Sequence, residues 1–159
     1  MINNLHDYPF NRPGMSLAEL IIVLCITALL ASIATLTFSG MTGRAQLQSA
    51  ADRLISDLRL VRDQAQSDKK TYTLQIKPGL LSYEAPGVFD INNERDISVN
   101  LGDSYYRINA MIIQLDNGSS ISFDKRGKPS SVGNIILRRG LDKITIVINK
   151  VGRIEQIDP

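Results

Sequence analysis

The most regular hydrophobic pattern in the chain is an uncharged run from Leu20 to Phe38, in which Leu, Ile, Ala and Val dominate. A helix of this length is about 28 Å long, close to the roughly 30 Å of a bilayer's hydrocarbon core. The sequence therefore predicts a membrane-spanning helix within residues 15–39. A secretory signal peptide is the alternative, because the stretch LLASIA resembles a signal-peptidase site, although such a peptide has a shorter apolar core.

The pattern becomes amphipathic in residues 40–68. Apolar positions recur at intervals of three and four, which places them on one side of a helix. This stripe consists of Leu47, Ala51, Leu54, Leu58, Val61 and Ala65. Arg53, Asp57, Arg59, Arg62 and Asp63 lie between them and are expected to face water. We expect the helix to end near Asp68 and its stripe to pack under a sheet, with a short coiled-coil seam as the alternative.

From Thr71 onward the hydrophobic period changes to two, which is typical of β-strands. Turn signals rich in Gly, Asn and Asp separate the strand-like stretches. The expected strands are Tyr72–Ile76, Leu80–Ala85, Ile97–Leu101, Tyr105–Leu115 with a break allowed, Ser120–Phe123, Asn134–Leu137, Ile144–Asn149 and Arg153–Ile157, with a polar loop at Pro86–Asp96. Residues 69–159 are thus predicted to form a β-rich head. The expected class is α+β, a long N-terminal helix packed on an antiparallel sheet.

The composition excludes several classes of chemistry. With 18 Lys and Arg against 16 Asp and Glu, the net charge of +2 gives no overall reason to expect nucleic acid. The single histidine, His6, precedes the apolar run, and the single cysteine, Cys25, lies inside it. The head therefore lacks the residues for a Cys/His zinc site or a Ser-His or Cys-His nucleophile. We expect no catalytic residue, no metal and no cofactor, which disfavours a membrane-anchored periplasmic enzyme.

One loop offers oxygen ligands. Residues Asp90–Asp96 read DINNERD and resemble the clustered carboxylates and amides that calcium needs. The spacing matches no specific calcium pattern. A solvated polar loop is the favoured interpretation.

The residues that precede the apolar run carry a more specific motif. Gly14 is followed by Met15, and Glu19 is the fifth residue after the glycine. This stretch, PGMSLAELIIVL, resembles the class III leader of type IV pilins and type II secretion pseudopilins. The resemblance implies that a prepilin peptidase removes residues 1–14 on the cytoplasmic face and that Met15 is then N-methylated. The later stretch ASIATLTF lacks the proline of many major pilins, which favours a pseudopilin or minor pilin.

Glu19 needs its own explanation, because a carboxylate inside lipid is costly and usually has a partner. After cleavage, Met15 carries a positive amine four residues away. We expect Glu19 to pair with that amine, in its own or a neighbouring subunit, and so to fix subunit register in a filament. The alternative is a solvated carboxylate at the headgroup level with no role.

The second half of the chain carries a further resemblance. ISFDKRGKPSS (Ile121–Ser131) and ITIVINKVGRIEQ (Ile144–Gln156) resemble the C-terminal pattern of the GspH/FimT minor pseudopilin family. RLISDLRLVRDQAQSDKKTYTLQI (Arg53–Ile76) fits that family's junction between helix and first strand. The resemblance implies a structural subunit near the tip of a type II secretion pseudopilus. Its partners would be other pseudopilins or pilins, the peptidase, the assembly machinery and the inner membrane, with the head in the periplasm.

Basic residues crowd into the last third of the chain: Arg126, Lys128, Arg138, Arg139, Lys143, Lys150 and Arg153. If turns gather them on one face, they would attract DNA phosphates. FimT-like minor pilins bind DNA during natural transformation through a basic C-terminal region, and Lys150 and Arg153 stand at the corresponding place. Interspersed acidic residues and the lack of interleaved aromatics favour a mixed solvated surface, so DNA binding is the alternative function.

Overall fold

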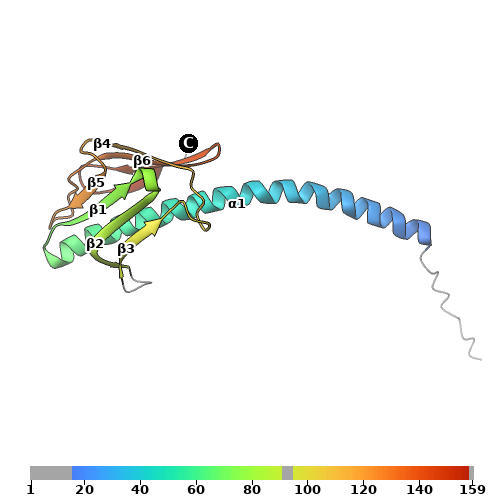
Figure 1. The fold of residues 1–159 in the computed structure, drawn as a ribbon, viewed down its shortest axis with the longest axis horizontal. Helices are drawn as coiled ribbons and strands as arrows, with labels where there is room; N and C mark the ends of the chain where they lie inside the picture. Colours follow the sequence, from blue (N-terminus) through green and yellow to red (C-terminus); the bar gives the residue numbers. More distant parts are fainter. Residues whose placement is uncertain (1–15, 91–94, 158–159) are drawn as a thin grey trace, which may run out of the picture. The chain divides into compact units, whose positions relative to one another are not determined.

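The computed structural model describes residues 16–90 and 95–157, except that the side chains of residues 33–42 are not described. Helix α1 runs from Leu17 to Asp68 and is followed by eight strands in the described part of the chain (Figure 1). The chain divides into two compact units, with the boundary between Ser39 and Gly40. Each unit is described by itself below.

The first unit consists of the N-terminal part of α1. The side chains of residues 16–32 are all exposed, and they are predominantly apolar on every side of the helix. Within the described residues, no helix combines the length and hydropathy required of a membrane span. The predicted span, Leu20–Phe38, extends into the residues whose side chains are not described.

The second unit contains the rest of α1 and two antiparallel four-stranded sheets. The first sheet has the order β3-β2-β1-β5 and the second the order β4-β6-β7-β8. The strands are β1 (Tyr72–Lys77), β2 (Ser82–Asp90), β3 (Arg95–Asn100), β4 (Ala110–Leu115), β5 (Ser120–Phe123), β6 (Gly133–Arg139), β7 (Asp142–Ile148) and β8 (Ile154–Ile157), with a short 3-10 helix, η1, at Pro78–Leu80. The α+β class is confirmed, with two sheets in place of one.

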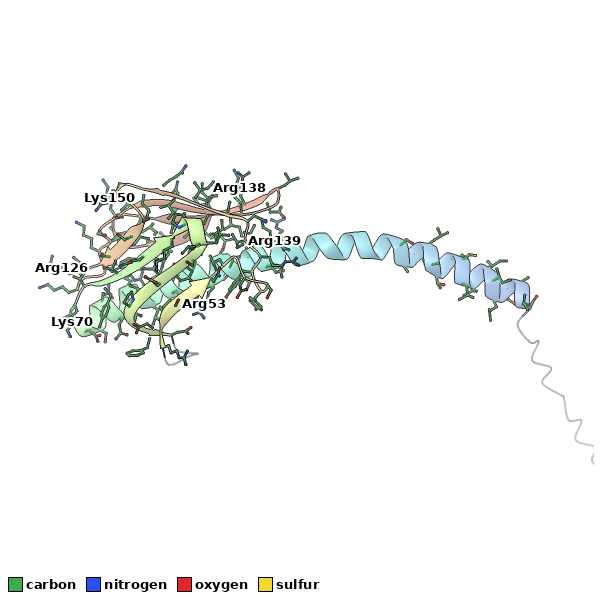
Figure 2. All side chains as sticks on the ribbon, viewed as in Figure 1. Arg53, Lys70, Arg126, Arg138, Arg139 and Lys150 are labelled. Atoms are coloured by element: carbon green, nitrogen blue, oxygen red, sulfur yellow. The ribbon has the colours of Figure 1, made fainter. Side chains whose placement is uncertain are left out.

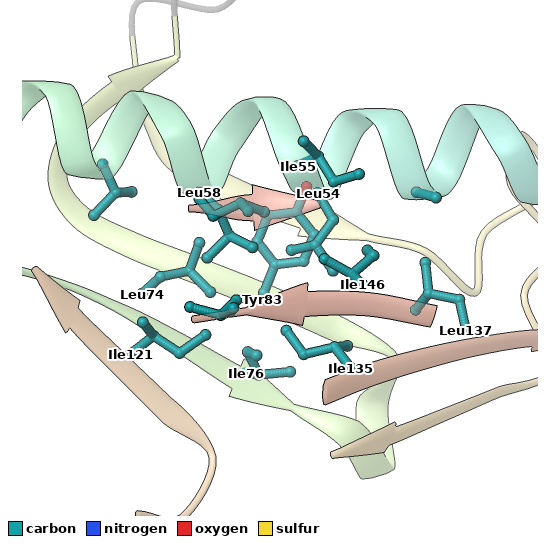
Figure 3. Close-up of a cluster of buried hydrophobic side chains, with 14 of the residues drawn as sticks. Leu54, Ile55, Leu58, Leu74, Ile76, Tyr83, Ile121, Ile135, Leu137 and Ile146 are labelled. Carbon is teal, nitrogen blue, oxygen red and sulfur yellow. The ribbon is translucent and has the colours of Figure 1, made fainter. Parts of the chain in front are cut away.

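The core lies between the amphipathic part of α1 and the two sheets (Figure 3). All six predicted stripe residues of the helix are buried, with exposed fractions of 0–1%. They face inward-pointing strand residues, among them Leu74, Tyr83, Ile121, Ile135 and Ile146. Burying a large aliphatic side chain contributes about 1.5–3 kcal/mol, so this stripe holds the helix to both sheets. The interpretation as a helix under a sheet is therefore confirmed, and the helix ends at Asp68 as expected.

Several strand boundaries differ from the expected ones. The strand expected from Leu80 begins at Ser82, because Leu80 belongs to η1. Pro86 lies inside β2, where a polar loop is expected, because the ladder between β2 and β3 is interrupted between Ala85 and Phe89. Proline is tolerated where a strand bulges and no ladder bond is needed. The break allowed within Tyr105–Leu115 is present, because β4 begins only at Ala110. The chain turns before it, where Asp103 accepts hydrogen bonds from the backbone N–H groups of Tyr105 and Arg107.

One of the five helix residues that were expected to face water, Asp57, is buried. Asp57 is 4% exposed because Tyr83 of β2 covers it and donates a 2.7 Å hydrogen bond to its Oδ2. Arg53 joins the same carboxylate at 2.9 Å and reaches Asp90, at the end of β2, at 2.6 Å. Burial raises the pKa of the Asp57 carboxyl, and the bonds from Tyr83 and Arg53 act against that rise. This network ties helix to sheet through paired buried polar groups.

Candidate functional sites

Two of the three residues expected to act in processing and assembly, Gly14 and Met15, lie outside the described residues. Glu19 lies in the first turn of α1 and its side chain is exposed. A carboxylate in the first turn interacts favourably with the positive end of the helix dipole. Because Met15 is not among the described residues, the expected pair between Glu19 and the amine of Met15 remains a prediction.

The helix around Glu19 is mostly apolar, and two of its hydroxyl groups are bonded to the helix backbone. Thr27 donates its hydroxyl to the backbone carbonyls of Val23 and Leu24, at 2.9 and 3.0 Å. Ser32 donates to the carbonyl of Ala28 at 2.8 Å. Nine large apolar side chains between Leu17 and Leu30 are 44–77% exposed. A helix that is apolar all round needs a cover of lipid or of other helices.

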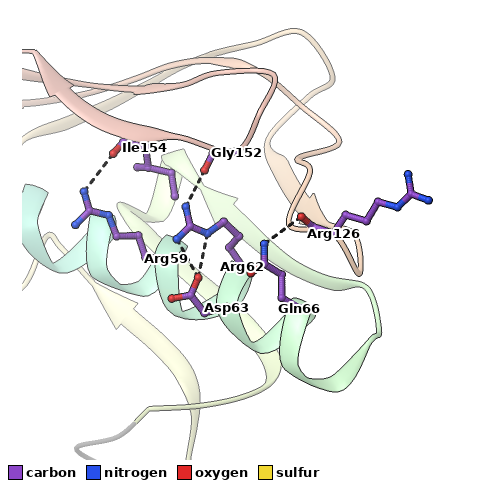
Figure 4. Close-up of polar contacts among 7 residues, drawn as sticks. All are labelled: Arg59, Arg62, Asp63, Gln66, Arg126, Gly152 and Ile154. Atoms are coloured by element: carbon purple, nitrogen blue, oxygen red, sulfur yellow. Dashed lines mark hydrogen bonds and ion pairs between the residues drawn. The ribbon is translucent and has the colours of Figure 1, made fainter.

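A second candidate site begins at the C-terminal part of α1, which holds two turns side by side (Figure 4). Arg62 donates to the carbonyl of Gly152 at 3.0 Å, and Gln66 donates to the carbonyl of Arg126 at 3.0 Å. Arg59 adds a 3.2 Å bond to the carbonyl of Ile154. The turn after β5 and the turn between β7 and β8 are thus fixed to the same helix.

Within the first of these turns, Asp124 organises the backbone. Its Oδ1 accepts hydrogen bonds from the backbone N–H groups of Arg126 and Lys128, both at 2.8 Å. These two donors lower the pKa of the Asp124 carboxyl. In the second turn, Asn149 Oδ1 accepts from the backbone N–H of Val151 and Arg153 in the same way. Side chains that satisfy turn amides hold both turns in one conformation.

An open groove of about 520 Å³ lies between the two turns. Arg126, Lys128 and Lys150 line it together with one carboxylate, Asp116. Pro129, Val132 and Val151 supply its apolar part. We call these residues the basic groove; three cations against one carboxylate favour an anionic ligand.

The structure places basic residues of the last third of the chain at two different ends of the head (Figure 2). Arg126 and Lys150 lie at one end of the head, and Arg138 and Arg139 lie toward the other. The reason is topological, because successive hairpins of an antiparallel meander turn at opposite ends of the sheet. Lys143 pairs in register with Arg138 and lies toward the same end.

Of the two residues expected to contact DNA, only Lys150 lines the basic groove. Arg153 is exposed and forms a 2.5 Å ion pair with Glu155 on β8. The other two cations of the groove are Arg126 and Lys128, which belong to a turn more than twenty residues before Lys150 in the sequence. The sequence predicts both glycine-containing turns, Asp124–Gly127 and Lys150–Gly152, but it does not predict that they lie side by side.

The described residues offer little for a metal. They contain no group of three or more His, Cys, Asp or Glu side chains placed to hold an ion. Asp90, the first residue of the loop considered for calcium, binds Arg53 at 2.6 Å. Residues 91–94 of that loop lie outside the described residues.

Comparisons with known proteins agree with the geometry. Residues 50–152, well over half of the chain, match the family model for type II transport protein GspH. Two crystal structures of the type IV minor pilin FimU from Pseudomonas aeruginosa share the fold. The first has a TM-score of 0.52 at 20% identity over 75% of this chain and 92% of that one. The second has a TM-score of 0.50 at 18% identity over 70% and 92%.

No curated protein matches the sequence. The family match covers most of the amphipathic part of α1, the whole first sheet and strands β4, β6 and β7 of the second sheet, and it ends before β8. It includes all three cations of the basic groove. This chain is therefore a member of the GspH family and has a pilin-like fold.

Proposed function

We propose that this chain is a minor pseudopilin, a structural subunit of a type II secretion pseudopilus near its tip, without catalytic activity. The observation that carries the proposal is the GspH family match, which spans most of the head. The exposed apolar helix of residues 17–32 supports it, because such a helix needs lipid before assembly and other helices in the filament.

In this proposal a prepilin peptidase cleaves after Gly14, and Met15 becomes the methylated N-terminus. Residues 15–39 hold the subunit in the inner membrane with the head in the periplasm. Other pseudopilins then bind the helix, and Glu19 pairs with the Met15 amine of its own or a neighbouring subunit. That pairing reduces the desolvation cost of both charges and sets the register.

The processing step is tested by mass spectrometry of the N-terminal peptide from membrane-extracted protein. The expected N-terminus is a methylated Met15. An intact Met1, or a cut after the LLASIA stretch, would contradict the pseudopilin leader. Gly14→Leu should leave residues 1–14 attached.

The assembly step is tested with Glu19→Ala in cells that contain the whole secretion system. We expect normal membrane insertion and cleavage, but a loss of co-purification with the other pseudopilins. Glu155→Ala removes an exposed carboxylate from the head and is the matched control. Normal co-purification of the Glu19→Ala protein would contradict the assembly role of Glu19.

The basic groove favours a second candidate function, a FimT-like minor pilin that binds DNA during natural transformation. Fluorescence anisotropy with labelled DNA and the full chain in detergent measures this directly. Binding should weaken with salt, and replacing Arg126, Lys128 and Lys150 with Ala should reduce the logarithmic salt slope by about 2–3, as expected for the loss of about three phosphate contacts.

The control for DNA binding is Arg138→Ala with Lys143→Ala, which removes two cations from the opposite end of the head. Equal losses in both variants would indicate attraction by overall charge rather than a site. No binding at low salt would exclude the DNA-uptake function and leave the secretion pseudopilin.

A further inference from the structure

The hairpin between β6 and β7 exposes an apolar residue at its tip. Leu141 is 99% exposed, the highest value among the exposed large hydrophobic residues of the described chain. Its neighbour Gly140 has a positive φ of 61° and donates its N–H to Asn109 Oδ1 at 3.1 Å. The turn is therefore held in place by the adjoining segment, with the leucine directed outward.

Cations surround this leucine. Arg44 of α1 and Lys143 of β7 line an open pocket of about 350 Å³ together with Leu141 and Asp142. Arg139 extends to Gly43, where its guanidinium would lie 3.0 Å from an added β-carbon. Arg138 is exposed on the adjoining β6 and is in register with Lys143. We call Arg44, Arg138, Arg139, Leu141 and Lys143 the hairpin patch; Asp142 is the carboxylate among them.

The hairpin patch lies where the chain enters the head. Arg44 follows Ser39, the last residue of the expected membrane segment, by five positions. This limits the distance between their backbones to about 17 Å even for an extended chain. The β7–β8 turn lies far from this point, because it is bonded to Arg62 of α1, about 28 Å along the helix from Gly43. The hairpin patch therefore lies at the end of the head to which the membrane segment is covalently joined.

We propose that the hairpin patch binds an anionic bilayer surface. Leu141 enters the boundary between headgroups and acyl chains, while Arg44, Arg138 and Lys143 contact lipid phosphates. An isolated exposed leucine is ordinary on a protein surface. A rigid apolar tip among cations is the combination that favours interfacial binding to anionic lipid. The lipid contact itself depends on the hairpin patch, and its place as a resting contact of the unassembled subunit rests on the proposed function.

The test uses a Leu141→Trp variant of the full chain, which otherwise contains no Trp. The variant is reconstituted into vesicles of phosphatidylcholine, or of phosphatidylcholine with phosphatidylglycerol, each with and without brominated acyl chains. We expect a blue-shifted emission and quenching by bromine in the anionic vesicles. Val151→Trp is the matched control. Val151 is 80% exposed and lies at the tip of the opposite hairpin, between β7 and β8.

A charge variant tests the cations separately. Adding Arg44→Gln and Lys143→Gln to Leu141→Trp should lower the ratio of inserted to free hairpin about fivefold for each cation removed. Quenching that is equal with and without phosphatidylglycerol, or equal at Leu141→Trp and Val151→Trp, would overturn the proposal. A blue shift without quenching that disappears when the protein is diluted in lipid would also overturn it, because the tip would then contact a second subunit.

Flotation of the same vesicles separates this proposal from the membrane anchor. If the chain floats with phosphatidylcholine alone and the Trp at 141 is not quenched, the anchor stands and the hairpin proposal fails. If the chain floats only with anionic vesicles and the Trp is quenched, the hairpin proposal stands and the anchor fails. Neither flotation nor quenching would reject both.

Discussion

The backbone of Gly152 lies against the carbonyl oxygen of Gly127, so that an added β-carbon at position 152 would fall less than 3.0 Å from that oxygen. The two residues belong to different turns, twenty-five positions apart in the sequence, and both have positive φ, 81° and 76°. This contact brings the cations of the two turns to one groove. It also explains why the late Lys-Val-Gly-Arg turn requires its glycine.

Gly152→Ala should therefore destabilise the head by roughly 2–4 kcal/mol, because the positive φ and the collision each add strain. The measurement is chemical unfolding of the full chain in detergent, followed by the far-UV signal of the sheets. Gly118→Ala is the control, since its φ is 76° but nothing lies within 4 Å of an added β-carbon. Equal losses for both variants would show that the contact with Gly127 adds nothing.

Tyr83→Phe should cost about 1.5–3 kcal/mol of unfolding free energy, the range for a hydrogen bond to a charged group. The change keeps the ring in the core but leaves the buried Asp57 with Arg53 as its remaining bonded side chain. Tyr105→Phe removes a hydroxyl from a residue that is 66% exposed and should be nearly neutral. The same unfolding measurement applies, and a neutral Tyr83→Phe would contradict the role of the bond.

The Asp57 carboxyl should titrate above its ordinary pKa of 3.8, because burial disfavours the charged form. The folded state then binds this proton more tightly than the unfolded state. The contribution of Asp57 to the free energy of unfolding therefore falls as pH rises through the window just above 3.8. NMR titration of the carboxyl carbons measures the pKa, and Tyr83→Phe should raise it further. A value below 3.8 would contradict this assignment.

The Asp124 carboxyl should show the opposite sign. Its pKa lies below 3.8 because the backbone N–H groups of Lys128 and Arg126 donate to the charged form. Its stabilising contribution is present above pH 3.8 and is lost as the pH falls through the folded-state pKa. In the same titration, protonation should coincide with shifts of the amide signals of residues 126 and 128. Unchanged amide signals would contradict the role of Asp124 in holding the turn.

The local elements of the head were predictable because they follow from short-range periodicity. The six stripe residues on α1 define its buried side, and the sequence predicts β5 with the observed limits, Ser120 to Phe123. The errors occur where distant segments decide the outcome. Asp57 lies at the edge of the helical stripe and is buried because Tyr83 happens to cover it. Pro86 remains within a strand because β2 bulges against β3.

The sequence by itself determined the long helix, the α+β class and the motif around Gly14, Met15 and Glu19, because these depend on spacing along the chain. The tertiary structure decided how the basic residues are shared between two surfaces. One groove contains Arg126, Lys128 and Lys150, because hydrogen bonds from Arg62 and Gln66 hold two turns against the same helix. Arg138, Arg139 and Lys143 go to the opposite end because successive antiparallel hairpins turn at opposite ends of the sheet. Such groupings depend on contacts between distant segments, which no local pattern encodes.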